Sequence, residues 1–79
     1  MRILLVGAGG VGSAFTAIAA RRDFFERCVV ADYDAAKAER AADADDRYVA
    51  AQIDASSAEA VAAVCREHRI THVMSYFGE

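Results

Sequence analysis

The sequence lacks the features that mark several classes of protein. It contains no proline, no internal repeat and no low-complexity linker. No apolar run is long enough to cross a bilayer, and the apolar N-terminal run leads straight into glycines, unlike a signal peptide. A net charge of −3 and the lack of a basic cluster argue against nucleic acid as a partner. We expect one small cytoplasmic domain that contacts neither membranes nor nucleic acids.

Few residues suit metal binding or redox chemistry. The two cysteines, Cys28 and Cys65, lie far apart and form no C-x-x-C pair. Both fall at apolar positions of predicted elements, so we expect buried free thiols in a reducing cytoplasm. His68 and His72 flank a predicted helix end and strand start, and Cys65 does not complete a zinc site with them. We predict no metal site and no catalytic acid–base pair in this chain.

What the sequence does contain is a glycine-rich turn after a short apolar run. Residues 2–6 are largely apolar, residues 7–12 read Gly-Ala-Gly-Gly-Val-Gly, and an alanine-rich amphipathic stretch follows. Twenty residues past Gly12, a second apolar run ends on Asp32. The order of strand, glycine loop, helix, strand and terminal acid is the fingerprint of a dinucleotide-binding unit.

Each part of this pattern suits a pyrophosphate bound at the start of a helix. Unpaired N–H groups and the positive end of the helix dipole attract the phosphates. Gly7 permits the tight turn, Gly9 lets the pyrophosphate approach the backbone, and Gly12 lets helix and strand pack closely. Gly10 adds conformational freedom. The alternative, a plain strand-to-helix turn, rarely needs so many glycines.

Asp32 indicates which cofactor to expect. At the end of the second strand its carboxylate would accept hydrogen bonds from the adenosine ribose hydroxyls, and it would repel a 2′-phosphate. NADP sites usually supply an arginine here, whereas Tyr33 and Asp34 follow in this chain and the nearest downstream cation is Lys37. We therefore predict NAD(H) in preference to NADP(H), with Asp34 as the helix N-cap. The alternative for Asp32 is a cap or a solvated loop acid.

The hydrophobic pattern predicts strands that alternate with helices. Strands are expected at residues 2–6, 28–31, 48–53 and 71–74, and helices at 10–22, 34–42 and 56–68. The first helix is expected to bury Val11, Ala14, Phe15, Ile18 and Ala19. A capping box from Ser56 to Glu59 is expected to open the third helix. The acidic run at residues 43–46 is expected to form a solvated loop.

This order of elements predicts an α/β fold. We expect a partial Rossmann fold, with a parallel four-stranded sheet of order 3-2-1-4 and three helices. The first two helices should cover one face of the sheet and the third helix the other. The ligand crevice should lie beyond the strand ends where the order reverses, so that residues 7–12, Asp32, Asp54 and Ser75 share one edge.

The chain length of 79 residues is about half that of a complete dinucleotide fold. We expect residues 1–74 to form a truncated NAD(P)-binding half-domain and residues 75–79 an atypical C-terminal tail. A domain this short is marginal as a monomer. Its fourth strand would be an exposed edge, and such edges invite pairing with another chain. We therefore predict a homo-oligomer formed through the fourth strand.

The same segments resemble a known family. Residues 3–12, residues 30–32 and the run Ile53-Asp54-Ala55 before a serine-capped helix are similar to the N-terminal domain of saccharopine dehydrogenase-like oxidoreductases, and residues 59–74 fit it as well. The resemblance implies a parent NAD(P)-dependent dehydrogenase that oxidises or reduces a secondary amine between two amino-acid-like pieces. It also implies substrate-binding groups in a later domain, so this chain alone is not expected to turn over substrate.

The resemblance implies a role for individual residues as well. The pyrophosphate would be held by Gly7, Gly9, Gly10, Val11 and Gly12. Asp32, followed by Tyr33, would hold the adenosine ribose, and Asp54 with Ala55 would lie beside the adenine. Ser75 is the candidate on the nicotinamide side, where the family commonly has an Asn-containing stretch and this chain departs from it.

Two other classes share part of this pattern. Adenylating enzymes that activate ubiquitin-like carboxyl termini have a similar glycine loop followed by serine, and an acid on the ATP ribose. They continue with an Asn- and Arg-containing stretch, and residues 35–40 of this chain lack asparagine. A regulatory NAD- or ATP-sensing domain, of the kind that gates potassium transport, shares the fold and the terminal acid without catalysis. A preference for ATP would favour either alternative over a dehydrogenase.

Overall fold

The structure, a computed structural model, describes residues 1–7 and 9–75. Strands and helices alternate along this part of the chain in the order β1 (Arg2–Val6), α1 (Gly10–Ala19), β2 (Arg27–Asp32), α2 (Ala35–Ala42), β3 (Tyr48–Gln52), α3 (Ala58–Glu67) and β4 (His72–Ser75). All strand pairs are parallel, and the sheet order is β3-β2-β1-β4. The predicted α/β architecture, a partial Rossmann fold with sheet order 3-2-1-4 and three helices, is confirmed.

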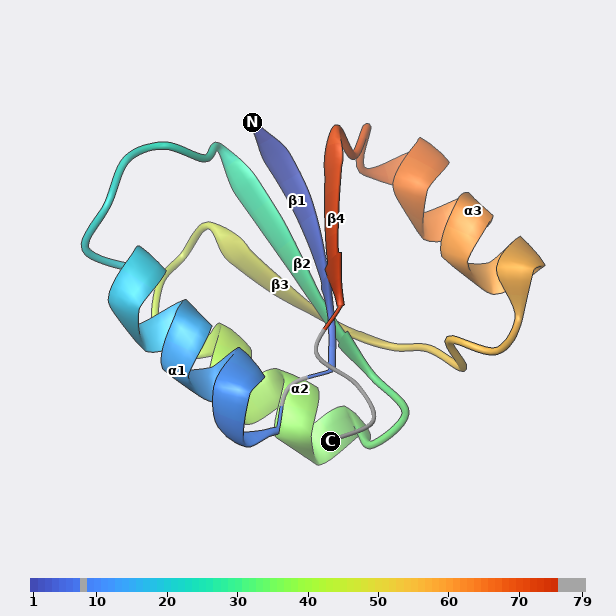
Figure 1. Ribbon diagram of the computed structural model, residues 1–79, viewed down its shortest axis with the longest axis horizontal. Helices are drawn as coiled ribbons and strands as arrows, with labels where there is room; N and C mark the ends of the chain where they lie inside the picture. The colour runs from blue at the N-terminus through green and yellow to red at the C-terminus, as the bar shows by residue number, and fades with distance from the viewer. Residues whose placement is uncertain (8, 76–79) are drawn as a thin grey trace.

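Helices cover the sheet from both sides, as the alternation of strand residues requires. Figure 1 shows α1 and α2 together on one side of the sheet and α3 on the other. On the α1–α2 side the buried cluster consists of Ile3, Leu5, Ala19, Phe25, Cys28, Val30, Ala41 and Tyr48. On the α3 side it consists of Leu4, Val6, Val29, Ala31 and Ile53, against which residues of α3 such as Val61, Val64 and Cys65 pack. The predicted placement of the three helices is therefore confirmed.

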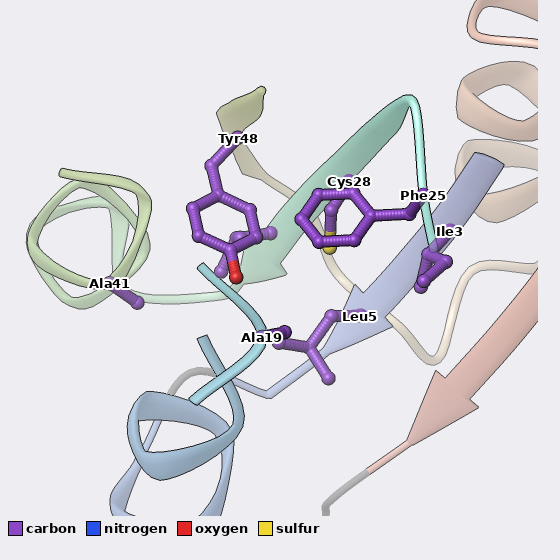
Figure 2. Close-up of a cluster of buried hydrophobic side chains, with 8 residues drawn as sticks. Ile3, Leu5, Ala19, Phe25, Cys28, Ala41 and Tyr48 are labelled. Carbon is purple, nitrogen blue, oxygen red and sulfur yellow. The ribbon is translucent and has the colours of Figure 1, made fainter. Parts of the chain in front are cut away.

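An aromatic pair anchors the cluster on the α1–α2 side (Figure 2). Phe25 is 3% exposed, and its ring stacks on that of Tyr48 with centroids 5.4 Å apart. The Tyr48 hydroxyl donates a hydrogen bond of 2.7 Å to the carbonyl of Thr16 in α1. Burial raises the pKa of the Cys28 thiol to about 12. Cys28 is thus a buried free thiol as predicted, whereas the free Cys65 is only half-buried.

The predicted buried stripe of α1 is partly wrong. The helix ends at Ala19 and not at Arg22. Ile18 is 62% exposed and Ala14 is also exposed, whereas Thr16, which the pattern left out, is 1% exposed. The helix contacts the sheet along the line from Thr16 to Ala19, and successive residues are rotated by about 100°, so Ile18 points away from it. The side chain of Val11 lies outside the described residues.

The predicted capping box of α3 is wrong by one residue. The N-cap is Ser57, whose hydroxyl oxygen accepts a hydrogen bond of 3.2 Å from the Ala60 N–H. Glu59 therefore falls one position too early to reach back to the N-cap. The Ser56 hydroxyl instead donates a hydrogen bond to the carboxylate of Asp54.

The predicted solvated acidic loop is wrong for Asp45. Its carboxylate accepts hydrogen bonds from Nε and Nη2 of Arg47, at 2.8 and 3.1 Å, and these bonds lower the pKa of Asp45 to about 2. Arg47 also donates to the carbonyls of Ala20 and Arg22 at 3.0 and 2.7 Å and lies over the Phe25 ring, 4.2 Å from its centroid. The pair therefore joins the loop before β3 to the end of α1.

The end of α3 is a Schellman motif. The N–H of Ile70 donates to the carbonyl of Cys65 at 2.9 Å, and the N–H of Arg69 to that of Arg66 at 3.3 Å. Arg69 adopts the left-handed conformation that this motif demands, with φ of 54°. A glycine would adopt it without strain.

Candidate functional site

The strands bring the predicted site residues to one edge of the sheet. Gly7 follows β1, Asp32 ends β2, and Asp54 lies two residues past the end of β3. Ser75 ends β4, where it pairs with Val6 of β1. Because parallel strands end at the same edge, residues far apart in the sequence become neighbours there.

A cleft of about 420 Å³ opens at the β2–β3 side of this edge. Its lining consists of Val6, Asp32, Tyr33, Ile53, Asp54, Ala55 and Ser56. Four predicted site residues thus come together, namely Asp32, Tyr33, Asp54 and Ala55, and the volume is typical of small-molecule pockets. Ser75 does not line this cleft, because the strand order places β4 on the other side of β1.

The carboxylate of Asp54 is held in place by Ser56. The Ser56 hydroxyl donates to Oδ1 of Asp54 at 2.6 Å, and the Ser56 N–H donates to the same atom at 3.0 Å. These bonds, the hydroxyl first, lower the pKa of Asp54 and keep it a charged acceptor at the cleft. Ser56 was not predicted as a site residue, although an Asp side chain often bonds the backbone two residues further on in an Asx-turn.

The loop after β2 joins Asp32 to the start of α2. The N–H of Asp34 donates to Oδ1 of Asp32 at 2.8 Å. Oδ1 of Asp34 in turn accepts from the N–H groups of Ala36 and Lys37, at 3.0 and 3.4 Å. Asp34 is therefore the N-cap of α2, as predicted. Tyr33 stands between the two acids with 75% of its surface exposed.

The glycine turn connects β1 to α1. Gly7 is buried, its φ is 96°, and its N–H donates to the carbonyl of Ala31 at 2.8 Å, so the chain turns sharply while still bonded to β2. Gly9 is the exposed N-cap of α1, and a Cβ built on it would meet no heavy atom of the described residues within 4 Å, its chain neighbours aside. Gly10, Val11 and Gly12 form the first turn of α1. The start of this helix therefore offers open backbone, which is what a pyrophosphate needs.

The sequence matches the family model described as saccharopine dehydrogenase NADP binding domain over residues 3–78. The chain belongs to this family. The resemblance that the motifs predicted is confirmed, and the chain is a dinucleotide-binding module of these oxidoreductases. No curated protein matches the sequence.

In this dinucleotide-binding module the predicted residues fall into separate groups along the edge. The acid-lined cleft lies beside β2 and β3, the glycine turn leaves the central strand β1, and Ser75 ends β4 on the far side. Across residues 1–7 and 9–75, no three His, Cys, Asp or Glu side chains are grouped as a metal site would need. None of the helices in that same part of the chain has the length and apolarity to span a membrane.

Proposed function

We propose that the chain binds NAD(H) across the carboxyl edge of its sheet, as the cofactor module of a saccharopine dehydrogenase-like oxidoreductase. The observation that carries the proposal is the open helix start at Gly9 on the same edge as a cleft lined by Asp32 and Asp54. When bound, a nicotinamide dinucleotide supplies or accepts a hydride. The residues of this chain bind and orient the cofactor.

Each group of the site takes one part of the cofactor. The pyrophosphate is assigned to the turn and the first helical residues, Gly7, Gly9, Gly10, Val11 and Gly12. Asp32 accepts hydrogen bonds from the ribose beside Tyr33, and Asp54 with Ala55 lies beside the adenine. The bonds from Ser56 support this last role, because they hold a charged acceptor in a fixed direction. Ser75 is assigned to the nicotinamide side.

The preference for NAD(H) over NADP(H) rests on the acids after β2. The family description names NADP, but a 2′-phosphate on a ribose held by Asp32 would approach a carboxylate. A vicinal diol suits that carboxylate as a hydrogen-bond donor, whereas a phosphate is repelled by it. The residues of this chain therefore fit the unphosphorylated ribose better.

Catalysis and assembly complete the proposal. We assign cofactor binding to the predicted half-domain, residues 1–74, together with Ser75, which ends β4 and so belongs to the sheet and not to the predicted tail. Residues 76–79 of that tail lie outside the described residues. We expect no turnover by this chain alone. We also propose self-association through β4, because Val73 is 57% exposed on this edge strand. Sedimentation of the wild type and of Val73→Lys tests this: a monomeric wild type, or an unchanged oligomer in the variant, would contradict it.

A titration followed by ¹⁵N-amide NMR tests the proposed function. NADH, NADPH and ATP are added in parallel to the chain. We expect NADH to shift the amides of Gly9, Tyr33 and Ala55, NADPH to shift them less, and Arg66 on α3 to stay unmoved as an internal control. A preference for ATP would overturn the oxidoreductase assignment. A dispersed spectrum that no nucleotide shifts would overturn binding itself.

A further inference from the structure

We propose that Asp34 is a second residue, after Asp32, that excludes a 2′-phosphate and so selects NAD over NADP. This inference rests on the proposed function, because it concerns the ribose corner of the same site. The ribose corner consists of Asp32, which ends β2, and of Tyr33 and Asp34, which lead to α2.

The start of α2 lies against Asp32, and its own N-cap engages its backbone donors. The bond of 2.8 Å from the Asp34 N–H to Oδ1 of Asp32 places the start of α2 directly against the acid that would hold the ribose. Free N–H groups at a helix start are what a phosphate would bind. Here the N–H groups of Ala36 and Lys37 already donate to Oδ1 of Asp34, at 3.0 and 3.4 Å. An anion of the chain itself thus occupies two of the donors that a 2′-phosphate would use.

The ribose corner carries net negative charge. Asp32 and Asp34 supply two carboxylates, against which the start of α2 carries one ammonium group, that of the exposed Lys37. A phosphate that enters beside them meets net negative charge, and little of this repulsion is offset by hydrogen bonds. Because Asp34 is exposed, salt should weaken its share of the repulsion.

The two acids have separable effects. Asp32 both binds the ribose hydroxyls and repels a phosphate, so its removal should weaken every adenosine ligand. The Asp34 carboxylate accepts hydrogen bonds from the backbone of α2 and is not assigned to the ribose. Its charge should therefore change the affinity only for ligands that carry a 2′-phosphate. Asp34→Asn keeps an oxygen that caps α2 equally well and removes only the charge.

The experiment compares 5′-AMP with 2′,5′-ADP, which differ by the 2′-phosphate, on the whole chain. Dissociation constants are measured by calorimetry for the wild type, Asp34→Asn and Asp43→Asn. Asp43→Asn is the matched control. Asp43 is the C-cap at the other end of α2, and its replacement changes the net charge of the chain by the same amount as Asp34→Asn. NADH and NADPH are titrated in the same way, at low and at high salt.

We expect the wild type to bind 5′-AMP and to exclude 2′,5′-ADP. Asp34→Asn should improve the affinity for 2′,5′-ADP on the order of tenfold, as one removed like charge predicts, with little change for 5′-AMP and less gain at high salt. Asp43→Asn should leave the ratio unchanged. If Asp34→Asn alters the ratio no more than Asp43→Asn does, the inference is wrong while NAD binding stands. If the wild type binds neither 5′-AMP nor NADH, the proposed function fails and the inference with it.

Discussion

Replacing Gly9 with alanine should impair cofactor binding and leave the fold intact. Apart from its chain neighbours, the added Cβ meets no heavy atom of the described residues within 4 Å, and φ of −74° suits any residue. Alanine is a poorer N-cap than glycine by up to about 1 kcal/mol, and reduced freedom of the unfolded chain offsets about 0.4–1 kcal/mol of this. The free energy of unfolding should therefore change by less than about 0.5 kcal/mol, and Tm by less than about 4 °C.

Binding should respond differently, because the methyl group occupies the space through which a pyrophosphate reaches the backbone. Loss of a single hydrogen bond to a charged group costs about 1.5–3 kcal/mol. The dissociation constant for NADH should therefore rise roughly 10- to 100-fold in Gly9→Ala.

Gly7→Ala is the contrasting variant. At φ of 96° a side chain is strained by roughly 1–2 kcal/mol, so Tm should fall by roughly 4–16 °C. Thermal melts followed by circular dichroism and NADH titrations followed by fluorescence measure both quantities. An unaltered NADH affinity in a stable Gly9→Ala variant would refute the assignment of the pyrophosphate. A loss of stability as large as that of Gly7→Ala would show that Gly9 serves the fold.

Three further substitutions test the structure. Arg69→Gly should raise Tm by up to roughly 8 °C in thermal melts, because relief of a strain of roughly 1–2 kcal/mol at φ of 54° exceeds the roughly 0.4–1 kcal/mol that the greater freedom of glycine in the unfolded chain costs; a lower Tm would contradict this. Tyr48→Phe should lower the free energy of unfolding in urea by about 1 kcal/mol, through loss of the bond to the Thr16 carbonyl. Because burial raises the pKa of Tyr48 from 10 to about 12, the wild type should keep its stability below pH 10 and lose part of it as pH rises through 12, a loss that Tyr48→Phe should not show. Ser56→Ala should raise the pKa of Asp54 in a carboxyl ¹³C NMR titration, and an unchanged pKa would show that Ser56 does not hold the acid.

The sheet could be predicted from the sequence because each strand is short, apolar and bounded by a turn. The predicted bounds of β1 match the structure, and those of the other strands differ by one residue at one or both ends. The orientation of α1 was harder to predict. An alanine-rich helix can bury any of several faces with a similar free energy. In α1 the buried face contains Thr16 and Ala19, and Ile18 is therefore exposed.

The candidate site was predictable where backbone direction alone places a residue. Asp32 and Asp54 follow strand ends, and parallel strands must bring them to one edge. The cap of α2 at Asp34 was also predictable. The short-range hydrogen bonds before α3 were not, because two neighbouring serines compete for the same cap. Ser57 caps α3 and Ser56 holds Asp54, and only the fold distinguishes these roles.

In the proposed assignment, cofactor preference and fold depend on different atoms of this chain. The glycine turn and the strand ends form the edge through backbone conformation, as φ of Gly7 and the open space at Gly9 illustrate. The ribose corner depends on two side chains whose bonds to the backbone would survive replacement of a carboxylate by an amide. A change from Asp to Asn at residue 34 would then alter the charge that a 2′-phosphate meets without altering the helix that it caps. Membership in a family whose description names NADP is therefore compatible with the proposed preference for NAD, because the residues proposed to select the cofactor are not those that form the sheet.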